Sequence, residues 1–241
     1  MTGPSERVAV PPNVGSGPGP VTPDGCAVEF YALMPAGREP GVVHAAVPDG
    51  ASILELGAGA GRLTRSLVAL GHDVVAVDES AEMLERIDGA EAVHSRIEDL
   101  DLPPCFDAAL LASHLINAPH RETRRAFLRT CRRHIRDDGC VVIERHAPDW
   151  FDTAHPVTTT WEGIVVRLRE VRRPAPGLLF CTIDYGAGGS WWTHSFTNAR
   201  VDDAELAELL AWAGLRLDTF LTEDRGWIRA VPDGPSPFDT R

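Results

Sequence analysis

Lysine is absent from this sequence of 241 residues, in which all 23 basic side chains are arginine. Schiff-base chemistry, covalent attachment of pyridoxal phosphate and a phosphate-binding loop of the Walker type each need a lysine amine. The sequence therefore excludes these three kinds of site.

Cysteine is scarce, and no two cysteines form a C-x-x-C pair. This spacing indicates neither a disulfide framework nor a zinc site, so we expect a reducing, cytoplasmic location and no bound metal. No apolar run approaches the ~20 residues that cross a bilayer, and no signal core opens the chain, so we expect no membrane association. The five cysteines are Cys26, Cys105, Cys131, Cys140 and Cys181.

Positive charge is also in deficit, since 35 acidic residues face 23 basic ones and the net charge is −12. Nucleic-acid binding needs clustered positive charge, which this field would oppose. We therefore expect no nucleic-acid partner and favour a small-molecule acceptor. The length suits one α/β domain, and a homodimer is compatible with it.

The stretch 52–78, SILELGAGAGRLTRSLVALGHDVVAVD, is the strongest positive signal. Its first apolar run predicts a strand that helices cover on both sides. Gly57, Gly59 and Gly61 then allow a sharp turn and a close approach of backbone N–H groups to a ligand. A second apolar strand ends in Asp78, whose carboxylate can accept hydrogen bonds from two ribose hydroxyls. The stretch predicts a nucleoside pocket.

The glycine spacing narrows the choice of nucleoside. A dinucleotide fingerprint needs a glycine where Arg62 stands, and Glu55 would repel a pyrophosphate but suit a cationic ligand. At E-L-G-A-G-A-G the chain resembles motif I of the class I S-adenosylmethionine-dependent methyltransferases, over roughly residues 50–147 and more loosely to the C-terminus. The resemblance implies an α/β fold with a doubly wound, Rossmann-like, mostly parallel sheet, an antiparallel C-terminal strand and S-adenosylmethionine as cofactor.

The resemblance also assigns cofactor contacts. It implies that the glycine loop presents its backbone to the methionine moiety, that apolar side chains enclose the adenine, and that Glu98 accepts the exocyclic amine. Arg96 stands where many relatives have an aspartate, so a solvated surface acid is the alternative for Glu98. The expected cofactor-binding residues are Glu55, Gly57, Ala58, Gly59, Asp78, Met83, Ile97, Glu98 and Ser113.

Two histidines are expected beside the transferred methyl group. His114 and Asn117 follow the fourth predicted strand and His146 follows the fifth, and ligands collect at the carboxyl ends of parallel strands. A histidine with an unperturbed pKa of about 6.5 can remove a proton at neutral pH. We predict His114 as the base, with His146 as the second candidate and Asn117 facing the acceptor. Bracing of the loop or a hydrogen bond to the cofactor is the alternative.

Residues 151–200 break the alternation of strands and helices. Three strand-like runs predict a β-meander inserted after the fifth strand, and in similar enzymes such an insertion shapes the acceptor pocket. The predicted acceptor contacts are Trp161, Tyr185 and Trp192 in this segment and Tyr31 on an N-terminal helix. The alternative is that these aromatic residues fill the meander's own core or anchor the helix.

The two ends of the chain differ in composition from its centre. Residues 1–24 are rich in proline and glycine without periodicity, which predicts a flexible tail. A second, polar tail is predicted over residues 233–241. Between them, residues 25–232 are predicted to form a single methyltransferase domain, with 151–200 as the cap over the substrate.

Together these patterns predict transfer of a methyl group from S-adenosylmethionine to nitrogen or oxygen of a small molecule in specialised metabolism. Within the same fold, the alternative is a non-methylating use of S-adenosylmethionine, such as intramolecular cyclisation. A non-catalytic binding protein is disfavoured because ligand-edge histidines accompany the nucleoside motif. An NAD-dependent reductase is disfavoured by Glu55 and Arg62.

Overall fold

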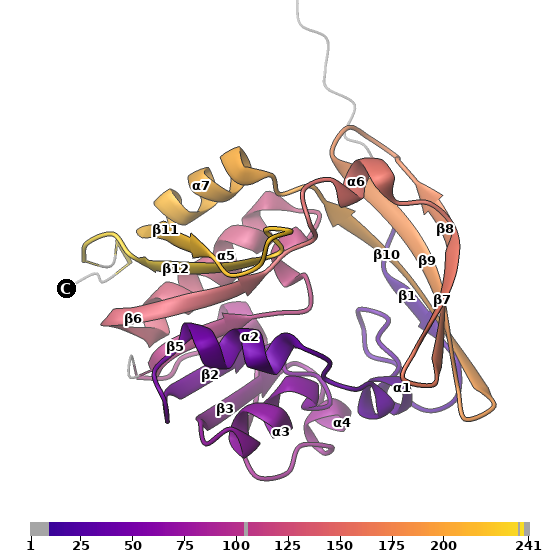
Figure 1. Cartoon of the computed structure of the whole chain (residues 1–241), viewed down its shortest axis with the longest axis horizontal. Coiled ribbons are helices and arrows are strands. Elements are labelled where there is room, and N and C mark those ends of the chain that lie inside the picture. Colours follow the sequence, from indigo (N-terminus) through magenta and orange to yellow (C-terminus); the bar gives the residue numbers. More distant parts are fainter. Residues whose placement is uncertain (1–9, 104–105, 236, 239–241) are drawn as a thin grey trace, which may run out of the picture.

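Two β-sheets of different construction stand on opposite sides of the molecule (Figure 1). The computed structural model describes residues 10–103, 106–235 and 237–238, so Cys105 lies outside the described residues. One sheet has seven strands and the other has five. Within the described part of the chain, no helix is long and apolar enough to cross a membrane.

The seven-stranded sheet has the nucleoside motif at its centre. In sheet order its strands are β11 (Leu215–Phe220), β12 (Trp227–Pro232), β6 (Ile135–Glu144), β5 (Phe106–Leu111), β2 (Ser52–Leu56), β3 (Asp73–Asp78) and β4 (Glu91–His94). The strands from β6 to β4 are parallel, whereas β12 is antiparallel to both β6 and β11. The predicted mostly parallel sheet with an antiparallel C-terminal end is confirmed.

Helices cover both faces of this sheet. They are α2 (Glu39–Ala46) and α3 (Arg62–Ala69) on one face and α5 (Arg121–His134) and α7 (Asp203–Trp212) on the other. Neighbouring residues of β2 enter opposite cores, Ile53 with α2 and α3, and Leu54 with α5 and α7. This double coverage is why the strand has an apolar run with no polar face.

Three short elements follow parallel strands at their carboxyl ends. They are α4 (Ala81–Leu84) after β3, η1 (Ile97–Asp99) after β4 and η2 (Leu115–Asn117) after β5. Ser80 caps α4 by accepting a hydrogen bond from the Met83 N–H at 3.2 Å, as a serine before a helix should. All three elements therefore lie along the edge where ligands are expected.

The second sheet is antiparallel throughout. Its strands in order are β1 (Val14–Ser16), β10 (Ser190–Ala199), β9 (Leu178–Ala187), β8 (Ile164–Arg172) and β7 (Val157–Trp161), and α6 (Trp150–Thr153) leads into it from the first sheet. The predicted meander is confirmed in β8, β9 and β10. The strands β7 and β1 extend this meander and form the two edges of the sheet.

The predicted flexible tail over 1–24 is wrong for residues 10–24. The strand β1 pairs with β10, and the carbonyl of Pro18 accepts a hydrogen bond from Trp192 Nε1 at 2.9 Å. The strand β10, which is distant in sequence, supplies these hydrogen-bond partners at the edge of its sheet. The composition of residues 10–24 alone does not reveal such a partner. Residues 1–9 lie outside the described residues.

The predicted C-terminal tail over 233–241 also needs correction where it is described. Arg132 of α5 donates a hydrogen bond to the Gly234 carbonyl at 3.0 Å, and the ring of Phe238 lies 5.3 Å from that of Trp212. A buried arginine and an aromatic neighbour therefore fix this segment against α5 and α7. Residues 236 and 239–241 lie outside the described residues.

The helix α1 (Val28–Leu33) joins the two sheets. Phe30, which is buried, packs with Ile164 and Trp192 of the five-stranded sheet. Val28, two residues earlier and on the other side of the helix, packs with Ala60 of the glycine loop. The N-terminal segment thus connects the cap to the loop on which the cofactor prediction rests.

Candidate active site

The glycine loop between β2 and α3 has the conformation that the motif predicts. Gly57 and Gly59 have φ angles of 69° and 55°, which favour glycine. The N–H groups of Gly57 and Ala58 each donate to the Val77 carbonyl at 2.9 Å. A Cβ at Gly59 would meet nothing within 4 Å, so the backbone there faces open space. A ligand can approach the chain closely at this point.

Asp78 ends β3 beside this loop. Its Oδ2 accepts a hydrogen bond from the Gly59 N–H at 2.8 Å, and its Oδ1 accepts one from the Ser80 N–H at 2.9 Å. Burial raises the pKa of the Asp78 carboxyl, and these two N–H groups oppose that shift. Each oxygen still has lone-pair capacity for a ribose hydroxyl. The carboxylate is therefore oriented before any ligand arrives.

Glu55 lies beneath the loop, with only 3% of its surface exposed. Its Oε2 accepts a hydrogen bond from Thr64 Oγ1 at 2.6 Å. Desolvation raises the pKa of Glu55 to about 7, which the hydrogen bond from Thr64 and the charge of Arg62 oppose. A nearby cation would favour the ionised form. The assignment of Glu55 to the cationic end of the cofactor stays a prediction.

The residues predicted around the adenine line the same edge. Met83 is buried against Val28 and Ala60, and Ile97 Cδ1 lies 3.9 Å from the position that a Cβ on Gly57 would take. Glu98 is ion-paired with Arg96, whose Nε donates to Glu98 Oε1 at 3.0 Å. An adenine amine would have to share that carboxylate, so the role of Glu98 also stays a prediction.

Two non-glycine residues with positive φ follow β5. Ser113 has φ 53° and His114 has φ 59°, a conformation that costs about 1 kcal/mol or more for each residue. Glu144 at the end of β6 holds this turn, because its Oε2 accepts the Ser113 N–H at 2.7 Å. The turn brings the His114 side chain to the edge where the strands end.

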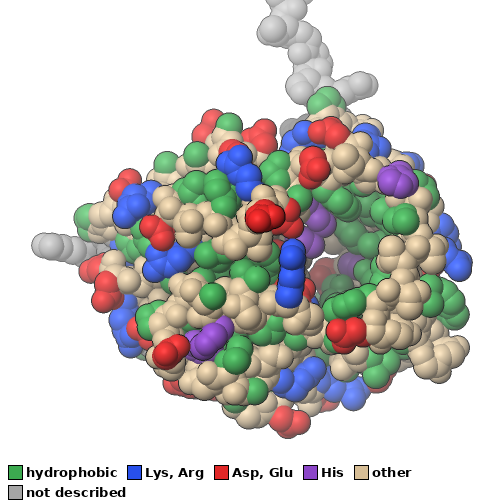
Figure 2. Space-filling model, viewed as in Figure 1, with side chains coloured by type: hydrophobic (Ala, Val, Ile, Leu, Met, Phe, Trp, Pro, Cys, Tyr) green, Lys and Arg blue, Asp and Glu red, His purple; other side chains and the backbone are tan. Residues whose placement is uncertain are grey.

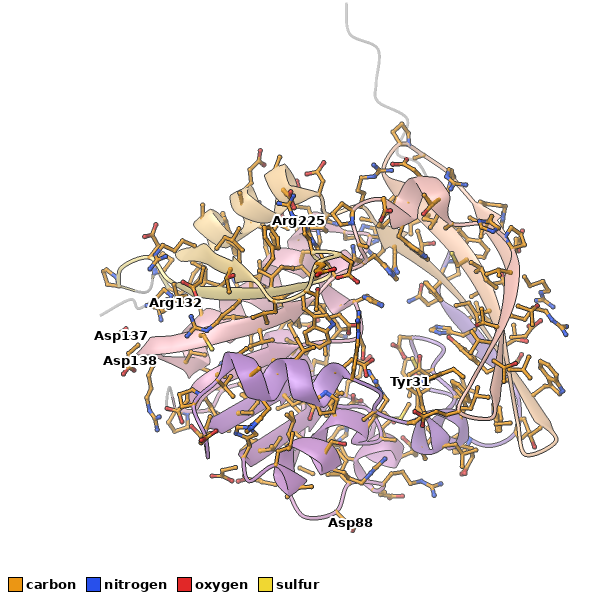
Figure 3. All side chains as sticks on the ribbon, viewed as in Figure 1. Tyr31, Asp88, Arg132, Asp137, Asp138 and Arg225 are labelled. Atoms are coloured by element: carbon orange, nitrogen blue, oxygen red, sulfur yellow. The ribbon has the colours of Figure 1, made fainter. Side chains whose placement is uncertain are left out.

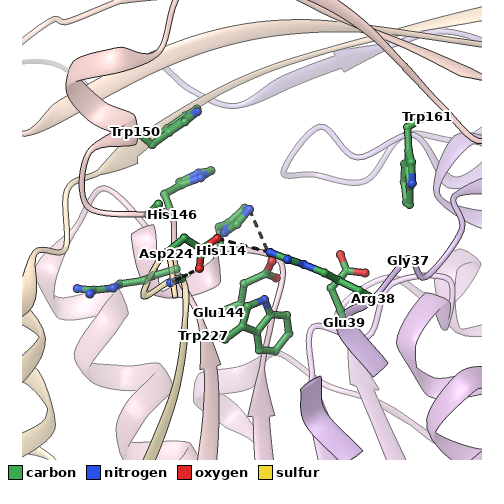
Figure 4. A pocket seen from close by; sticks show the side chains of 13 residues that line it. Gly37, Arg38, Glu39, His114, Glu144, His146, Trp150, Trp161, Asp224 and Trp227 are labelled. Atoms are coloured by element: carbon green, nitrogen blue, oxygen red, sulfur yellow. Dashed lines mark hydrogen bonds and ion pairs between the residues drawn. The ribbon is translucent and has the colours of Figure 1, made fainter. Parts of the chain in front are cut away.

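A cavity of about 390 Å³ lies beyond that edge. Its wall combines the segment before α2, the ends of β5 and β6, the α6 region, the tip of the β7–β8 hairpin and the β11–β12 turn. Figure 2 shows the hollow between the two halves of the molecule, with histidine side chains on its wall. Figure 4 shows His114, His146 and Glu39 around the same space. This volume suits a small molecule.

His114 has the environment that a proton acceptor needs. Its ring stacks on that of His146 with centroids 3.8 Å apart, and its Nε2 lies 3.9 Å from Glu144 Oε1. Its Nδ1 is buried and has no hydrogen-bond partner among the described residues. Burial lowers the pKa of His114, which the charge of Glu144 opposes. The imidazole is therefore neutral at pH 7, and Glu144 can stabilise the imidazolium that forms on proton uptake.

The second candidate base, His146, is wrong in this structure. Its Nε2 accepts a hydrogen bond from Asn198 Nδ2 at 2.7 Å, and its ring lies between those of His114 and Trp150. Desolvation, followed by the charge of His114, lowers the pKa of His146 to about 2. His146 does not take up a proton near neutral pH, and it supports the ring of His114 instead.

Asn117 does not face an acceptor either. It is fully buried, its Nδ2 donates to the Ala199 carbonyl at 2.9 Å, and its Oδ1 accepts the His146 N–H at 3.0 Å. Both ends of the amide are used in joining η2 to β10 and to the end of β6. The predicted acceptor contact is replaced by a bracing role.

The predicted aromatic contacts separate into two groups. Trp161 lines the cavity. Trp192 is 4% exposed in the core of the five-stranded sheet, and Tyr185 stacks on Phe30 with centroids 4.2 Å apart. Tyr31 lies between the two sheets (Figure 3), where burial raises its pKa. The prediction that Trp192 contacts an acceptor is wrong, because its side chain is buried in that core. The predicted contacts of Tyr31 and Tyr185 stay predictions.

Several wall residues have no predicted role. Glu144 falls at the expected ligand edge, so its position was a usable signal, and Trp150 follows shortly after it. Glu39 and Asp224 also line the cavity, but each lies in a segment with no local motif. Within the described ranges, no group of three or more histidine, cysteine or acidic side chains could hold a metal ion.

The fold and this edge together define a class of protein. A central β2–loop–α3 unit, an acid ending the next strand and an antiparallel terminal hairpin are the parts of a class I S-adenosylmethionine-dependent methyltransferase. Residues 53–139 match the family described as "Methyltransferase domain". Over this region the chain is similar to these methyltransferases, and S-adenosylmethionine is the cofactor that the glycine loop and Asp78 would hold.

Individual relatives agree with this class. The chain is 33% identical over 144 residues to the cypemycin N-terminal methyltransferase of Streptomyces sp, an alignment that covers 54% of this chain and 59% of that protein. The sugar N-methyltransferase KedS8 from Streptoalloteichus sp ATCC 53650 has a similar structure, with TM-score 0.67, 20% identity and coverage of 86% of this chain and 92% of that one. An S-adenosylmethionine-dependent methyltransferase from Clostridium acetobutylicum ATCC 824 has TM-score 0.68 at 12% identity, with coverage of 85% and 95%.

Proposed function

We propose that this protein transfers a methyl group from S-adenosylmethionine to an amine nitrogen of a small molecule that binds in the cavity. The observation that carries the proposal is the neutral His114 imidazole on the cavity wall, at the same sheet edge as the glycine loop. The names of two similar proteins, an N-terminal methyltransferase and a sugar N-methyltransferase, support nitrogen as the acceptor atom. A role in specialised metabolism, a cytoplasmic location and a homodimer stay predictions.

The cofactor supplies an electrophilic methyl carbon on a positively charged sulfur. In this chain, the glycine-loop backbone at Gly59 would lie along its amino-acid moiety and Asp78 would hold its ribose. Ile97 and Met83 offer apolar surface for the adenine. The bound methyl group would therefore be presented toward the cavity by the carboxyl edge of the sheet.

His114 would prepare the acceptor for attack. An alkylamine is protonated at neutral pH and has no free lone pair until it loses a proton. Nε2 of His114 can accept that proton because burial keeps the imidazole neutral, and Glu144 Oε1, 3.9 Å away, then faces the imidazolium. General-base assistance of this kind contributes roughly 10²- to 10⁴-fold, and alignment in the cavity contributes the rest.

The five-stranded sheet would exclude water and select the acceptor. Trp161 at the end of β7 and Trp150 at the start of α6 cover the cavity from this side. Indole rings on this side would shield the acceptor partly from solvent. This arrangement supports the predicted role of residues 151–200 as a substrate cap.

Incubation with S-adenosylmethionine carrying an isotopically labelled methyl group, together with a panel of small amines and alcohols, tests the proposal. Mass spectrometry should find the label on an amine and S-adenosylhomocysteine in equal amount. Methylthioadenosine without S-adenosylhomocysteine would show the cyclisation chemistry instead. Tight binding of NAD, without binding of S-adenosylmethionine or S-adenosylhomocysteine, would reject the proposal.

A further inference from the structure

Glu39, the first residue of α2, has one carboxylate oxygen in use and one free. Its Oε1 is ion-paired with Arg62 NH1 at 2.8 Å, and the Glu39 side chain is 21% exposed. Its Oε2 is buried and accepts no hydrogen bond from any described residue. Because Arg62 opens α3 directly after the glycine loop, this pair also fixes the position of Glu39 relative to the cofactor edge.

The free oxygen lies near an aromatic ring, and both residues line the cavity. A Cβ on Gly37 would lie 2.9 Å from Glu39 Oε2 and 3.1 Å from Trp161 Cζ2. The carboxylate oxygen and the indole therefore flank the same point of the wall, which Gly37 leaves unfilled. Figure 4 shows the three residues together on one side of the cavity. An anionic oxygen beside an indole is an arrangement that attracts a cationic nitrogen.

The arginines nearby make their contacts with other atoms and donate no hydrogen bond to this oxygen. Arg38 pairs with Asp224 at 3.5 Å, and Arg62 pairs with the other oxygen of Glu39. Arg145 also lines the cavity, but its guanidinium is buried and donates to the Val201 carbonyl at 2.8 Å. Glu144, which is buried, adds a second carboxylate to the wall, and these acidic groups would attract a cationic ligand.

We infer that Glu39 and Trp161 form a subsite for a cationic nitrogen of the acceptor, and that this subsite makes the protein prefer a charged acceptor over a neutral one of the same shape. The inference rests on the proposed function, since it names how the acceptor is recognised. It assigns a binding role to Glu39, which no sequence motif indicates. A hydroxyl acceptor of the same size would leave Oε2 without a cation.

Binding of matched probes tests the subsite without requiring turnover. Benzylamine and benzyl alcohol, and cyclohexylamine and cyclohexanol, differ in charge but little in shape. Calorimetric titration of protein saturated with S-adenosylhomocysteine should show each amine binding at least about tenfold more tightly than its alcohol. In Glu39→Gln this ratio should fall to within about twofold, because the amide still accepts from Arg62 but carries no charge.

The matched control is Glu29→Gln, which makes the same change in a carboxylate that pairs with Arg86 outside the cavity. It should keep the wild-type ratio. Trp161→Leu should lower the ratio as well, and it serves as the second variant if Glu39→Gln does not fold. Equal binding of amines and alcohols, absence of amine binding in the wild type, or an unchanged ratio in Glu39→Gln and Trp161→Leu would each overturn the subsite. Failure of the labelled-methyl experiment would instead reject the proposed function and leave the binding ratio as measured.

Discussion

The two sides of the cavity differ in how their residues are distributed along the chain. On the cofactor side, the glycine loop and Asp78 come from the single stretch 52–78. On the acceptor side, the wall brings together Glu39, His114 and Trp161 from three separate segments. The cofactor side is local in sequence, whereas the acceptor side is assembled by the fold.

This difference follows from the construction of the two sheets. In a parallel sheet, a strand, its loop and the next strand form one unit, so neighbours in sequence are neighbours at the ligand edge. In the antiparallel sheet, the fold decides which aromatic residues enter a core and which reach the cavity. Trp192 fills that core, whereas Trp161 at a hairpin tip reaches the acceptor side.

Replacing the proposed base should have the largest effect. We expect His114→Ala to lower kcat by roughly 10²- to 10⁴-fold while S-adenosylhomocysteine affinity stays unchanged, because the residue belongs to the acceptor side. Turnover and calorimetry measure the two effects. His120→Ala, which changes an exposed histidine before α5, should leave both unchanged. Equal turnover in the wild type and His114→Ala would rule out the assignment.

The pH profile should report the same group. The base must be neutral to act, and burial lowers the pKa of His114 from its ordinary 6.5. The rate should therefore fall as the pH falls through the lowered pKa, with the acidic limb below pH 6.5. This limb should disappear in His114→Ala. A limb above pH 6.5 would contradict the lowered pKa of His114.

The core of the cap should depend on Trp192 and not on its exposed neighbour. Trp192→Ala should lower the free energy of unfolding by about 3–5 kcal/mol, as loss of a large buried ring does. Trp191 is 47% exposed, so Trp191→Ala should lower the free energy of unfolding by less than about 1 kcal/mol. Denaturant unfolding measures both changes. Similar losses in the two variants would mean that the sheet has no distinct buried side at this position.

Removing the ribose acceptor should weaken the cofactor side alone. We expect Asp78→Ala to lose roughly 1–3 kcal/mol of S-adenosylhomocysteine binding, since the hydroxyls lose a charged acceptor and the loop loses the bond to Gly59. Calorimetry measures the loss. Asp73→Ala, at the other and exposed end of β3, should bind normally. An Asp78→Ala protein with wild-type affinity would place the cofactor elsewhere.

The smallest expected effect concerns cofactor affinity in a variant of the cap. Trp161→Ala should raise the acceptor KM but keep cofactor affinity within about threefold, under ~0.7 kcal/mol. Trp191→Ala, which lies in the same sheet but does not line the cavity, should change neither value. A collapse of cofactor affinity in Trp161→Ala would show that the division between the two sides is wrong.

The fold class and the expected cofactor edge could both be predicted from the sequence. Alternation of apolar strands and amphipathic helices predicts the parallel sheet, because burial on both faces requires it. Gly59 and Asp78 could be predicted as cofactor contacts because the backbone freedom and the carboxylate that they supply are properties of the residue types and their spacing. The position of His114 followed from the end of one strand.

The tertiary structure decided which side chains share the cavity and in what state. Asn117 and His146 lie at the predicted edge, but burial and hydrogen bonds to residues of β10 give them bracing roles. The segment 10–24, which looks unstructured in sequence, is held by the open edge of β10. Glu39 reaches the site because α2 packs beside α3. Strand pairing, burial and the lack of a hydrogen-bond donor at a carboxylate oxygen all depend on neighbours that are remote in sequence. Only the folded chain therefore defines them.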